Sequence, residues 1–262
     1  MRVTPVLAAL TLAVLTLAPS ECSGTGDSTQ PQTGSSSPGA AKGSSAASRI
    51  PTNSACPVMG DLEGKFTKSS QMDAYLACIV PSVEKWIDAS YANPSHPRGY
   101  YFIPLGATGA DGKCKYDDQT LFYCLASEKI YFGEQAVWTQ YTQHGDASAA
   151  LIMAHEVTHH FQNVANVPPA TVPNEQIRYE NQADCGAGAF ISYASKQKWL
   201  DRTDDLIDVA GSLAAAGSSP GPKQDHGSAP ERLAAFGRPL ISSDSNPLRA
   251  CNRYVPEVAL VS

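Results

Sequence analysis

His155-Glu156-Val157-Thr158-His159 is an HExxH sequence, and the rest of the chain is best read outward from it. On an α-helix, residues four apart lie on the same face, about 6 Å apart along the axis. His155 and His159 can therefore bind one Zn²⁺ ion, while Glu156 lies near the open coordination position as a base. The stretch thus predicts a helix that carries a zinc site.

A second segment places two carboxylates at helical spacing. Glu180, 21 residues beyond His159, forms an ExxxD pattern with Asp184, and both fall on one stripe with apolar neighbours. A buried carboxylate is costly unless it is paired or coordinates a metal. We therefore expect Glu180 as the third zinc ligand and Asp184 as the acceptor of an N–H from a ligand histidine. The alternative is a capping or salt-bridging pair on an exposed helix.

The order of periodic segments favours an α+β domain, with a small sheet followed by the active-site helices. Strands are expected at residues 100–103 and 128–132. Pro168, Pro169 and Pro173 separate the two metal-site helices, because proline lacks the amide donor. One helix is expected at residues 72–89, with an interruption at Pro81. The metal-site helix is expected to follow its N-cap Asp146 and to end near residue 164, and the next helix is expected at residues 174–198, with Asn174 as its N-cap. Two more helices are expected at residues 201–216 and from Pro230 onward.

The N-terminal fifth of the 262-residue chain has a different composition. Residues 1–20 combine Arg2, an apolar run and small residues, as a secretory signal peptide does. Residues 21–50 are rich in Ser, Gly, Thr and Pro, which predicts a disordered tether. Residues 51–262 are expected to form the zinc metallopeptidase domain. The chain is therefore expected to be exported.

Seven cysteines fit an oxidising compartment. Six lie in the expected domain and can form three disulfides: Cys56, Cys78, Cys114, Cys124, Cys185 and Cys251. Cys114 and Cys124 flank a turn, and Cys56–Cys78 and Cys185–Cys251 are the natural complements, although spacing alone does not settle the connectivity. Cys22 is left over after the apolar run. Its lipidation would tether the protein to the outer face of the membrane, whereas Pro19-Ser20-Glu21 favours simple secretion.

The net charge of −6 and the scattered Lys and Arg residues argue against a nucleic-acid partner. No basic stripe with interleaved aromatic residues is present in the sequence. The HExxH motif, whose glutamate is typical of the general base of a metalloprotease, makes a protein or peptide substrate the expected partner.

The two motifs resemble the bacterial neutral zinc metallopeptidases, which are zincins with a two-His, one-Glu site. The similarity extends through Phe122-Tyr123-Cys124, His226-Gly227-Ser228 and Cys251-Asn252-Arg253-Tyr254, over roughly residues 113–261. Leu125-Ala126 replaces the usual Pro-Ala pair, and Glu231 replaces a common Gln. The resemblance implies a zincin-like fold, which the three disulfides expected from the cysteine count would staple. By analogy with zincins, residues 129–132 would be the sheet edge beside the cleft, where a peptide could add as a strand.

His226 lies in a segment rich in Gly, Ser and Pro, where loops place functional groups. Together with the resemblance, this favours a catalytic role as oxyanion donor; the alternative is a surface histidine. His160 lies about 100° away from the ligand pair and is expected to be structural or solvent-facing. Thr158 and Gln162 are expected to be ordinary helix-face residues.

The resulting hypothesis is an exported endopeptidase with one Zn²⁺ per chain. Glu156 would take a proton from the zinc-activated water and deliver it to the leaving amine. Two alternatives remain: a non-catalytic zinc-containing binding or assembly protein of the cell envelope, and a disulfide-stapled exported domain with a coincidental HExxH. Retention of Glu156 favours catalysis, because a protein that only bound zinc would have no use for the base.

Overall fold

The computed structural model describes residues 46–51, 56, 62–200, 203–217 and 226–262, all within the unit Gln32–Ser262. A four-stranded sheet has the order β1-β2-β6-β5. β2 (Gly99–Ile103) is parallel to β6 (Lys129–Gly133), while β1 (Ser48–Arg49) and β5 (Leu121–Cys124) are antiparallel to their neighbours. β3 (Thr108–Asp111) and β4 (Cys114–Asp117) form a separate hairpin. The β1 strand places the start of the folded region before residue 51.

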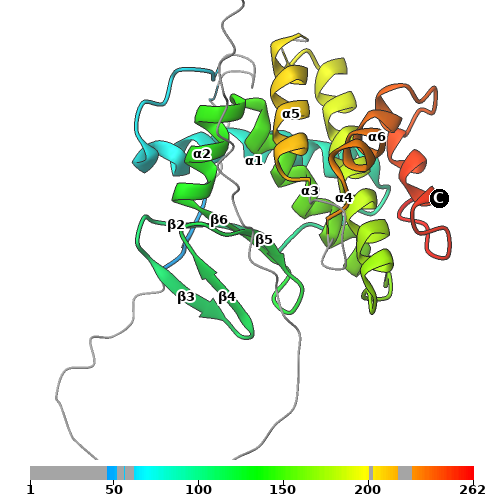
Figure 1. The fold of residues 1–262 in the computed structure, drawn as a ribbon, viewed down its shortest axis with the longest axis horizontal. Helices are drawn as coiled ribbons and strands as arrows, with labels where there is room; N and C mark the ends of the chain where they lie inside the picture. Colours follow the sequence, from blue (N-terminus) through cyan, green and yellow to red (C-terminus); the bar gives the residue numbers. More distant parts are fainter. Residues whose placement is uncertain (1–45, 52–55, 57–61, 201–202, 218–225) are drawn as a thin grey trace, which may run out of the picture. The chain divides into compact units, whose positions relative to one another are not determined.

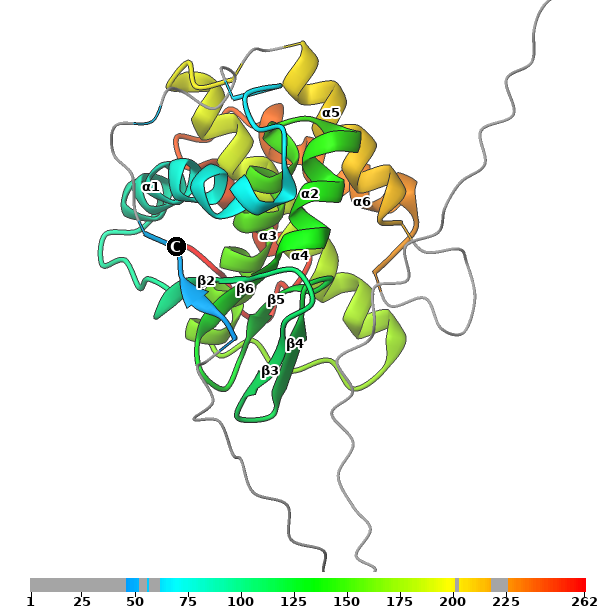
Figure 2. The ribbon, with the colours of Figure 1, turned by 90° about the vertical axis from the view of Figure 1, so that its left-hand side faces the viewer.

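The helices lie on one side of the sheet, and the β3–β4 hairpin extends from the other (Figures 1 and 2). They are α1 (Met72–Ser90), α2 (Glu134–His144), α3 (Ala147–Val164), α4 (Pro173–Lys196), α5 (Asp204–Ala215) and α6 (Ala229–Leu240), with 3₁₀ helices η2 (Ser69–Gln71) and η3 (Pro247–Arg253). The expected α+β class, with strands before most of the helices, is what the structure has. No helix in the described ranges is long and apolar enough to cross a membrane.

The sheet edge differs from the prediction. β6 is an interior strand that pairs with β2 on one side and β5 on the other, so the expected edge at residues 129–132 is wrong. The edge strand next to β6 is β5, a short segment that the sequence analysis did not assign. Its residues Leu121 and Phe122 are only half-buried, which weakens the alternating pattern that reveals a strand.

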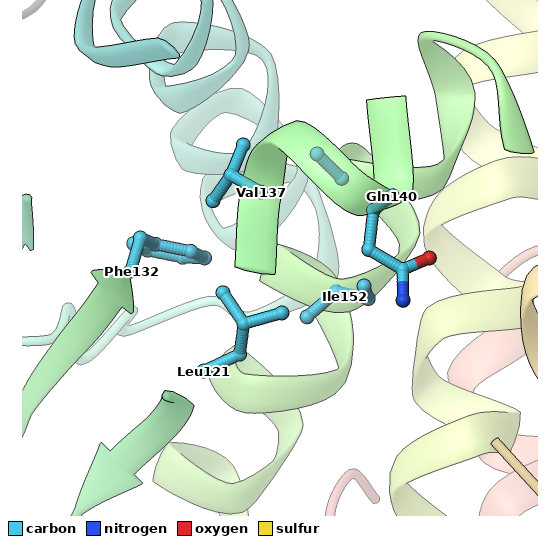
Figure 3. Close-up of a pocket in the computed structure, with 6 residues that line it drawn as sticks. Leu121, Phe132, Val137, Gln140 and Ile152 are labelled. Atoms are coloured by element: carbon cyan, nitrogen blue, oxygen red, sulfur yellow. The ribbon is translucent and has the colours of Figure 1, made fainter. Parts of the chain in front are cut away.

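The sheet-side core fixes β5 against the metal-site helix. Leu121 of β5, Phe132 of β6, Val137 of α2 and Ile152 of α3 converge on one apolar space that is too narrow to hold a water molecule (Figure 3). Such interdigitated contacts hold elements at a defined spacing. The edge strand is therefore held next to α3 by packing.

Helix α1 packs against both metal-site helices. Its Trp86 contacts Phe161 of α3 and Phe190 of α4, with ring centroids 5.5 Å and 5.6 Å apart. The expected interruption at Pro81 is wrong, because α1 runs through it without a break. Buried neighbours such as Ile79, Val80 and Val83 anchor the helix on both sides of the proline, so tertiary packing outweighs the lost hydrogen bond.

Two glycines let α4 approach its neighbours. A Cβ atom at Gly186 would lie 2.0 Å from Thr158 Oγ1 on α3, and one at Gly188 would lie 2.1 Å from the carbonyl oxygen of Phe236 on α6. Both distances are far inside van der Waals contact. Despite its low helix propensity, glycine therefore lets α4 pack closely on the other ligand-bearing helix, α3, at Gly186 and on α6 at Gly188.

One of the two predicted helix caps is wrong. Asp146 is the N-cap residue of α3, as predicted, but its side chain makes no capping bond and instead accepts a hydrogen bond from the Leu62 amide at 3.0 Å. Asn174 lies inside α4, because Pro173 already occupies the first turn and Val172 is the N-cap residue. Proline suits that position, since the first helical amides have no acceptor within the helix.

Three disulfides join Cys56 to Cys78, Cys114 to Cys124, and Cys185 to Cys251. These are the pairs that the sequence favoured. The third links α4 to η3, next to the expected site. The predicted signal peptide, most of the tether and Cys22 lie outside the described residues, as do residues 201–202 of the helix expected at 201–216.

Candidate metal centre

Two packed helices supply the expected donor groups. α3 carries His155 and His159 on one face, and α4 carries Glu180 opposite them. His155 Nε2 lies 3.1 Å from His159 Nε2 and 3.3 Å from Glu180 Oε2. Glu180 Oε1 lies 3.7 Å from His159 Nε2. The three groups can thus offer ligand atoms that all lie within 4.8 Å of one another.

This donor set fits a zinc ion. Two imidazoles and one carboxylate are a known ligand set of catalytic zinc sites, which keep a fourth position open. Glu180 is buried, and the two histidine side chains are only 12% exposed. A buried carboxylate among imidazole nitrogens is costly unless it is neutralised, and a divalent cation would do this. The prediction of three converging ligands therefore agrees with the arrangement of these side chains.

The site is electrostatically suited to a cation. Burial would lower the pKa of His155, but Asp184 and Glu180 raise it to about 10. Burial would raise the pKa of Glu180, but His159, His155 and His226 hold it well below its usual range. Burial would likewise raise the pKa of Asp184, but Arg232 and His155 hold it below its usual range. Both carboxylates therefore stay ionised and favour positive charge between the helices.

Each ligand histidine is oriented by a partner on its other nitrogen. His155 Nδ1 donates to Asp184 Oδ1 at 2.9 Å, as the sequence analysis expected. His159 Nδ1 donates to Gln162 Oε1 at 2.7 Å. Gln162 is therefore not an ordinary helix-face residue: its amide nitrogen donates to the Tyr179 carbonyl and to Gln182, which turns the amide oxygen toward His159. Both imidazoles thus direct Nε2 toward the site.

Arg232 of α6 completes this arrangement. Its Nε and Nη2 donate to Asp184 Oδ2 and Oδ1 at 2.8 Å and 2.7 Å, and both side chains are buried. Burial lowers the pKa of Arg232, but Asp184 more than offsets this and raises it. The bidentate pair holds Asp184 in the orientation that receives the His155 proton.

Replacing Arg232 with alanine is expected to destabilise the protein by about 3–5 kcal/mol, since Asp184 would keep a buried charge without its main partner. Urea unfolding of the metal-free protein measures the effect. Arg249→Ala is the control, because Arg249 pairs with Asp244 on the surface and should contribute about 0–1 kcal/mol. Equal losses in the two variants would contradict a structural role for the buried pair.

Glu156 is a residue of α3, and its side chain contacts the edge strand β5. Its Oε2 accepts a hydrogen bond from the Tyr123 amide of β5 at 2.8 Å, and the side chain is buried. Burial raises the pKa of Glu156, while His159 and His155 oppose the rise. A raised carboxyl pKa suits a group that must take up a proton and release it again.

His226 lies directly beside the donor set. Its Nδ1 is 3.2 Å from Glu180 Oε2, and 31% of the side chain is exposed. An isolated surface histidine is therefore the wrong description. The half-exposed ring borders the cluster and can reach a bound molecule there.

His160 is structural, in agreement with one of the two expectations. It is fully buried, with Nδ1 3.1 Å from the Tyr123 hydroxyl and Nε2 3.2 Å from the Ser95 carbonyl oxygen. The ring therefore ties α3 to β5 and to the segment that follows α1.

Three contributors were missed from the sequence: Gln162, Arg232 and the Tyr123 amide. Gln162 lies three residues after His159, a spacing that brings side chains together on a helix, so it was within reach of sequence reasoning. Charge balance required a cation for Asp184, and Arg232 was one of several candidates. A backbone amide leaves no signal in the residue types.

Comparison with known proteins agrees with this site. Residues 110–230 match the model of the family described as "Putative neutral zinc metallopeptidase". This range is just under half of the chain, and it contains both histidines, Glu156, Glu180, Asp184 and His226. No solved structure matches the chain.

Relatives share a similar portion. Uncharacterized protein Rv2575 of Mycobacterium tuberculosis is 27% identical over 161 residues, covering 54% of this chain and 55% of the relative. Uncharacterized protein YpfJ of Escherichia coli is 26% identical over 157 residues, covering 51% and 53%. The chain thus spans about half the length of the curated relatives it matches. The resemblance predicted from the motifs is confirmed: residues 110–230, which carry the site, are similar to the neutral zinc metallopeptidase family.

Proposed function

We propose that this protein is an exported zinc-dependent endopeptidase with a zincin-like site and one zinc ion per chain. The observation that carries the proposal is the buried cluster of His155, His159 and Glu180, with Glu156 beside it. The family match supports zinc and peptide hydrolysis. When bound, zinc acts as a Lewis acid that activates water and polarises a carbonyl group.

Groups of the protein itself carry out proton transfer, oxyanion stabilisation and peptide binding. Glu156 takes a proton from the attacking water and returns it to the leaving amine, and the Tyr123 amide holds its carboxylate in place. His226 donates to the oxygen on which negative charge develops. β5 pairs only with β6 among the described residues, so an extended peptide can add to its other edge.

The direct test uses the zinc-loaded protein and an unfolded protein substrate, with products identified by mass spectrometry. We expect internal peptide bonds to be cut, a chelator to stop cleavage, and added zinc to restore it. A protein with full zinc occupancy that cuts nothing in a diverse peptide library would instead support the zinc-containing binding or assembly protein.

His226→Ala is expected to lower kcat by roughly 10²–10³ with a smaller change in KM, as for a donor that acts mainly in the transition state. Zinc content at saturating zinc should stay near one per chain, because the three ligands remain. His96→Ala is the control, since His96 contacts Glu84 and Asp88 of α1 instead. Loss of zinc would make His226 a ligand, and a change in kcat under twofold would remove its catalytic role.

Export is proposed from the apolar N-terminal run and from the six cysteines, which suit an oxidising compartment. Labelling with a fatty-acid analogue in wild type and Cys22→Ser distinguishes a lipid tether from simple secretion. Label that depends on Cys22 supports the tether, whereas unlabelled protein in the medium supports secretion. Retention of unprocessed protein in the cytoplasm would contradict export.

A further inference from the structure

A pocket of about 300 Å³ lies beside the metal centre. Its walls come from three segments: the α3–α4 loop at residues 167–171, the start of α4, and the C-terminal segment that contributes Val255. Its volume is at the lower end of the roughly 300–1,000 Å³ range typical of ligand pockets. The pocket therefore has room for one side chain rather than for a folded partner.

Tyr179 connects this pocket to the zinc ligands. Its ring lines the pocket and also stacks on His159, with centroids 5.0 Å apart and planes within 13° of parallel. Glu180 is the next residue along α4. The pocket and the ligand His159 thus share Tyr179 as a neighbour, which places the pocket next to the donor set.

The loop wall is apolar and preorganised. Val167 is buried, and Pro168, Pro169 and Ala170 follow it along the pocket. Proline fixes its own φ angle, so this wall loses little conformational entropy when a ligand binds. Hydrophobic side chains gain most from such a surface.

The charged groups at the rim are already engaged within the protein. Arg178 donates from Nη2 to both carboxylate oxygens of Glu257 at 3.0 Å and 2.8 Å, and from Nε to the Tyr254 carbonyl at 2.9 Å. Glu175 accepts from the amide and the hydroxyl of Thr171 at 2.7 Å and 2.8 Å. An acidic or basic ligand would therefore find no free counter-charge among these pairs.

We infer that this pocket is a specificity subsite that binds an aliphatic side chain of the peptide substrate, adjacent to the scissile bond. The inference rests on the proposed function for the nature of the ligand. It rests on the walls, the rim charges and the contact through Tyr179 for the choice of side chain.

The test measures binding rather than turnover, by calorimetry on the zinc-loaded protein. The probes are three small peptide hydroxamates that share one zinc-binding group and differ in one side chain: isobutyl, carboxymethyl or hydrogen. We expect the isobutyl compound to bind at least about tenfold more tightly than the other two, as a filled apolar pocket discriminates by this order. Equal affinities, or no binding by any probe at full zinc occupancy, would overturn the inference.

A variant in which a large side chain fills the pocket tests whether the preference for the isobutyl compound arises there. Ala170→Trp should reduce the isobutyl preference to less than threefold and leave the affinity of the hydrogen compound unchanged. Val172→Trp is the matched control, because Val172 is 51% exposed, lies two residues further on and does not line the pocket. A preference that survives Ala170→Trp with normal melting would place the side chain elsewhere. If that variant does not fold, the wild-type comparison still decides.

Failure of the proposed function would look different. A protein that shows the pocket-dependent preference but cleaves no peptide would retain the subsite and lose the peptidase assignment. A protein that cleaves peptides without any preference for aliphatic side chains would retain the peptidase assignment and lose the subsite.

Discussion

Glu180→Ala is expected to leave the purified protein with far less than one zinc ion per chain. The variant removes one of three protein ligands, while His155 and His159 remain four residues apart on α3. Loss of an outer partner of a metal ligand typically costs 10–100-fold in affinity, and loss of the ligand itself should cost more than roughly 100-fold. Elemental analysis and competition with a chromogenic chelator measure the change.

Two further variants separate ligation from folding. Glu180→Gln keeps the shape of the side chain but removes its charge, so it should also lose most of the zinc affinity without opening a cavity. Glu175→Ala lies on the same helix, is exposed, and should bind zinc as the wild type does. Full zinc occupancy in Glu180→Ala would show that another group is the third ligand.

The metal cluster was predictable because it depends on local spacing. Helical periodicity placed His155 and His159 on one helix face, and Glu180 and Asp184 on one face of the next helix. Burial of the two carboxylates then required a metal ion or a hydrogen-bond partner for each of them. The structure brings these four side chains together. Gly186 and Gly188 indicated close packing of α4, but the sequence alone did not predict which residue of α3 Gly186 meets, namely Thr158.

The groups that orient the ligands were harder to find, because they come from distant segments. Arg232 lies 48 residues beyond Asp184, and its contact exists only because α6 packs on α4. The same reason explains the edge-strand error. Residues 129–132 have the stronger strand pattern, and that strength reflects an interior position rather than an edge.

The missing capping bond of Asp146 and the uninterrupted α1 show that tertiary contacts can outweigh local preference. Asp146 follows a cap-like pattern, yet its carboxylate lies in a buried position where the Leu62 amide is the available donor. Burial and the neighbouring Asp205 raise the pKa of Asp146 to about 7. A side chain that satisfies a distant amide is not available to cap its own helix.

Glu156→Gln is expected to reduce peptide hydrolysis by roughly 10²–10⁴-fold while zinc content and fold are retained. The amide is nearly isosteric and can still accept the Tyr123 hydrogen bond through its oxygen, but it cannot take a proton from water. Because Glu156 is not one of the clustered donors, the variant should hold about one zinc per chain. Steady-state cleavage of a peptide substrate, together with elemental analysis, measures both effects.

The control is Glu128→Gln, which changes a carboxylate that pairs with Arg98 away from the donor cluster. Its activity should match that of the wild type. Because Glu156 is not one of the clustered donors and zinc should be retained, hydroxamate binding should also survive in Glu156→Gln. Activity within tenfold of the wild type would mean that another group accepts the proton. Loss of both zinc and fold would make Glu156 a structural residue of α3, since its hydrogen bond to β5 would then matter more than its proton chemistry.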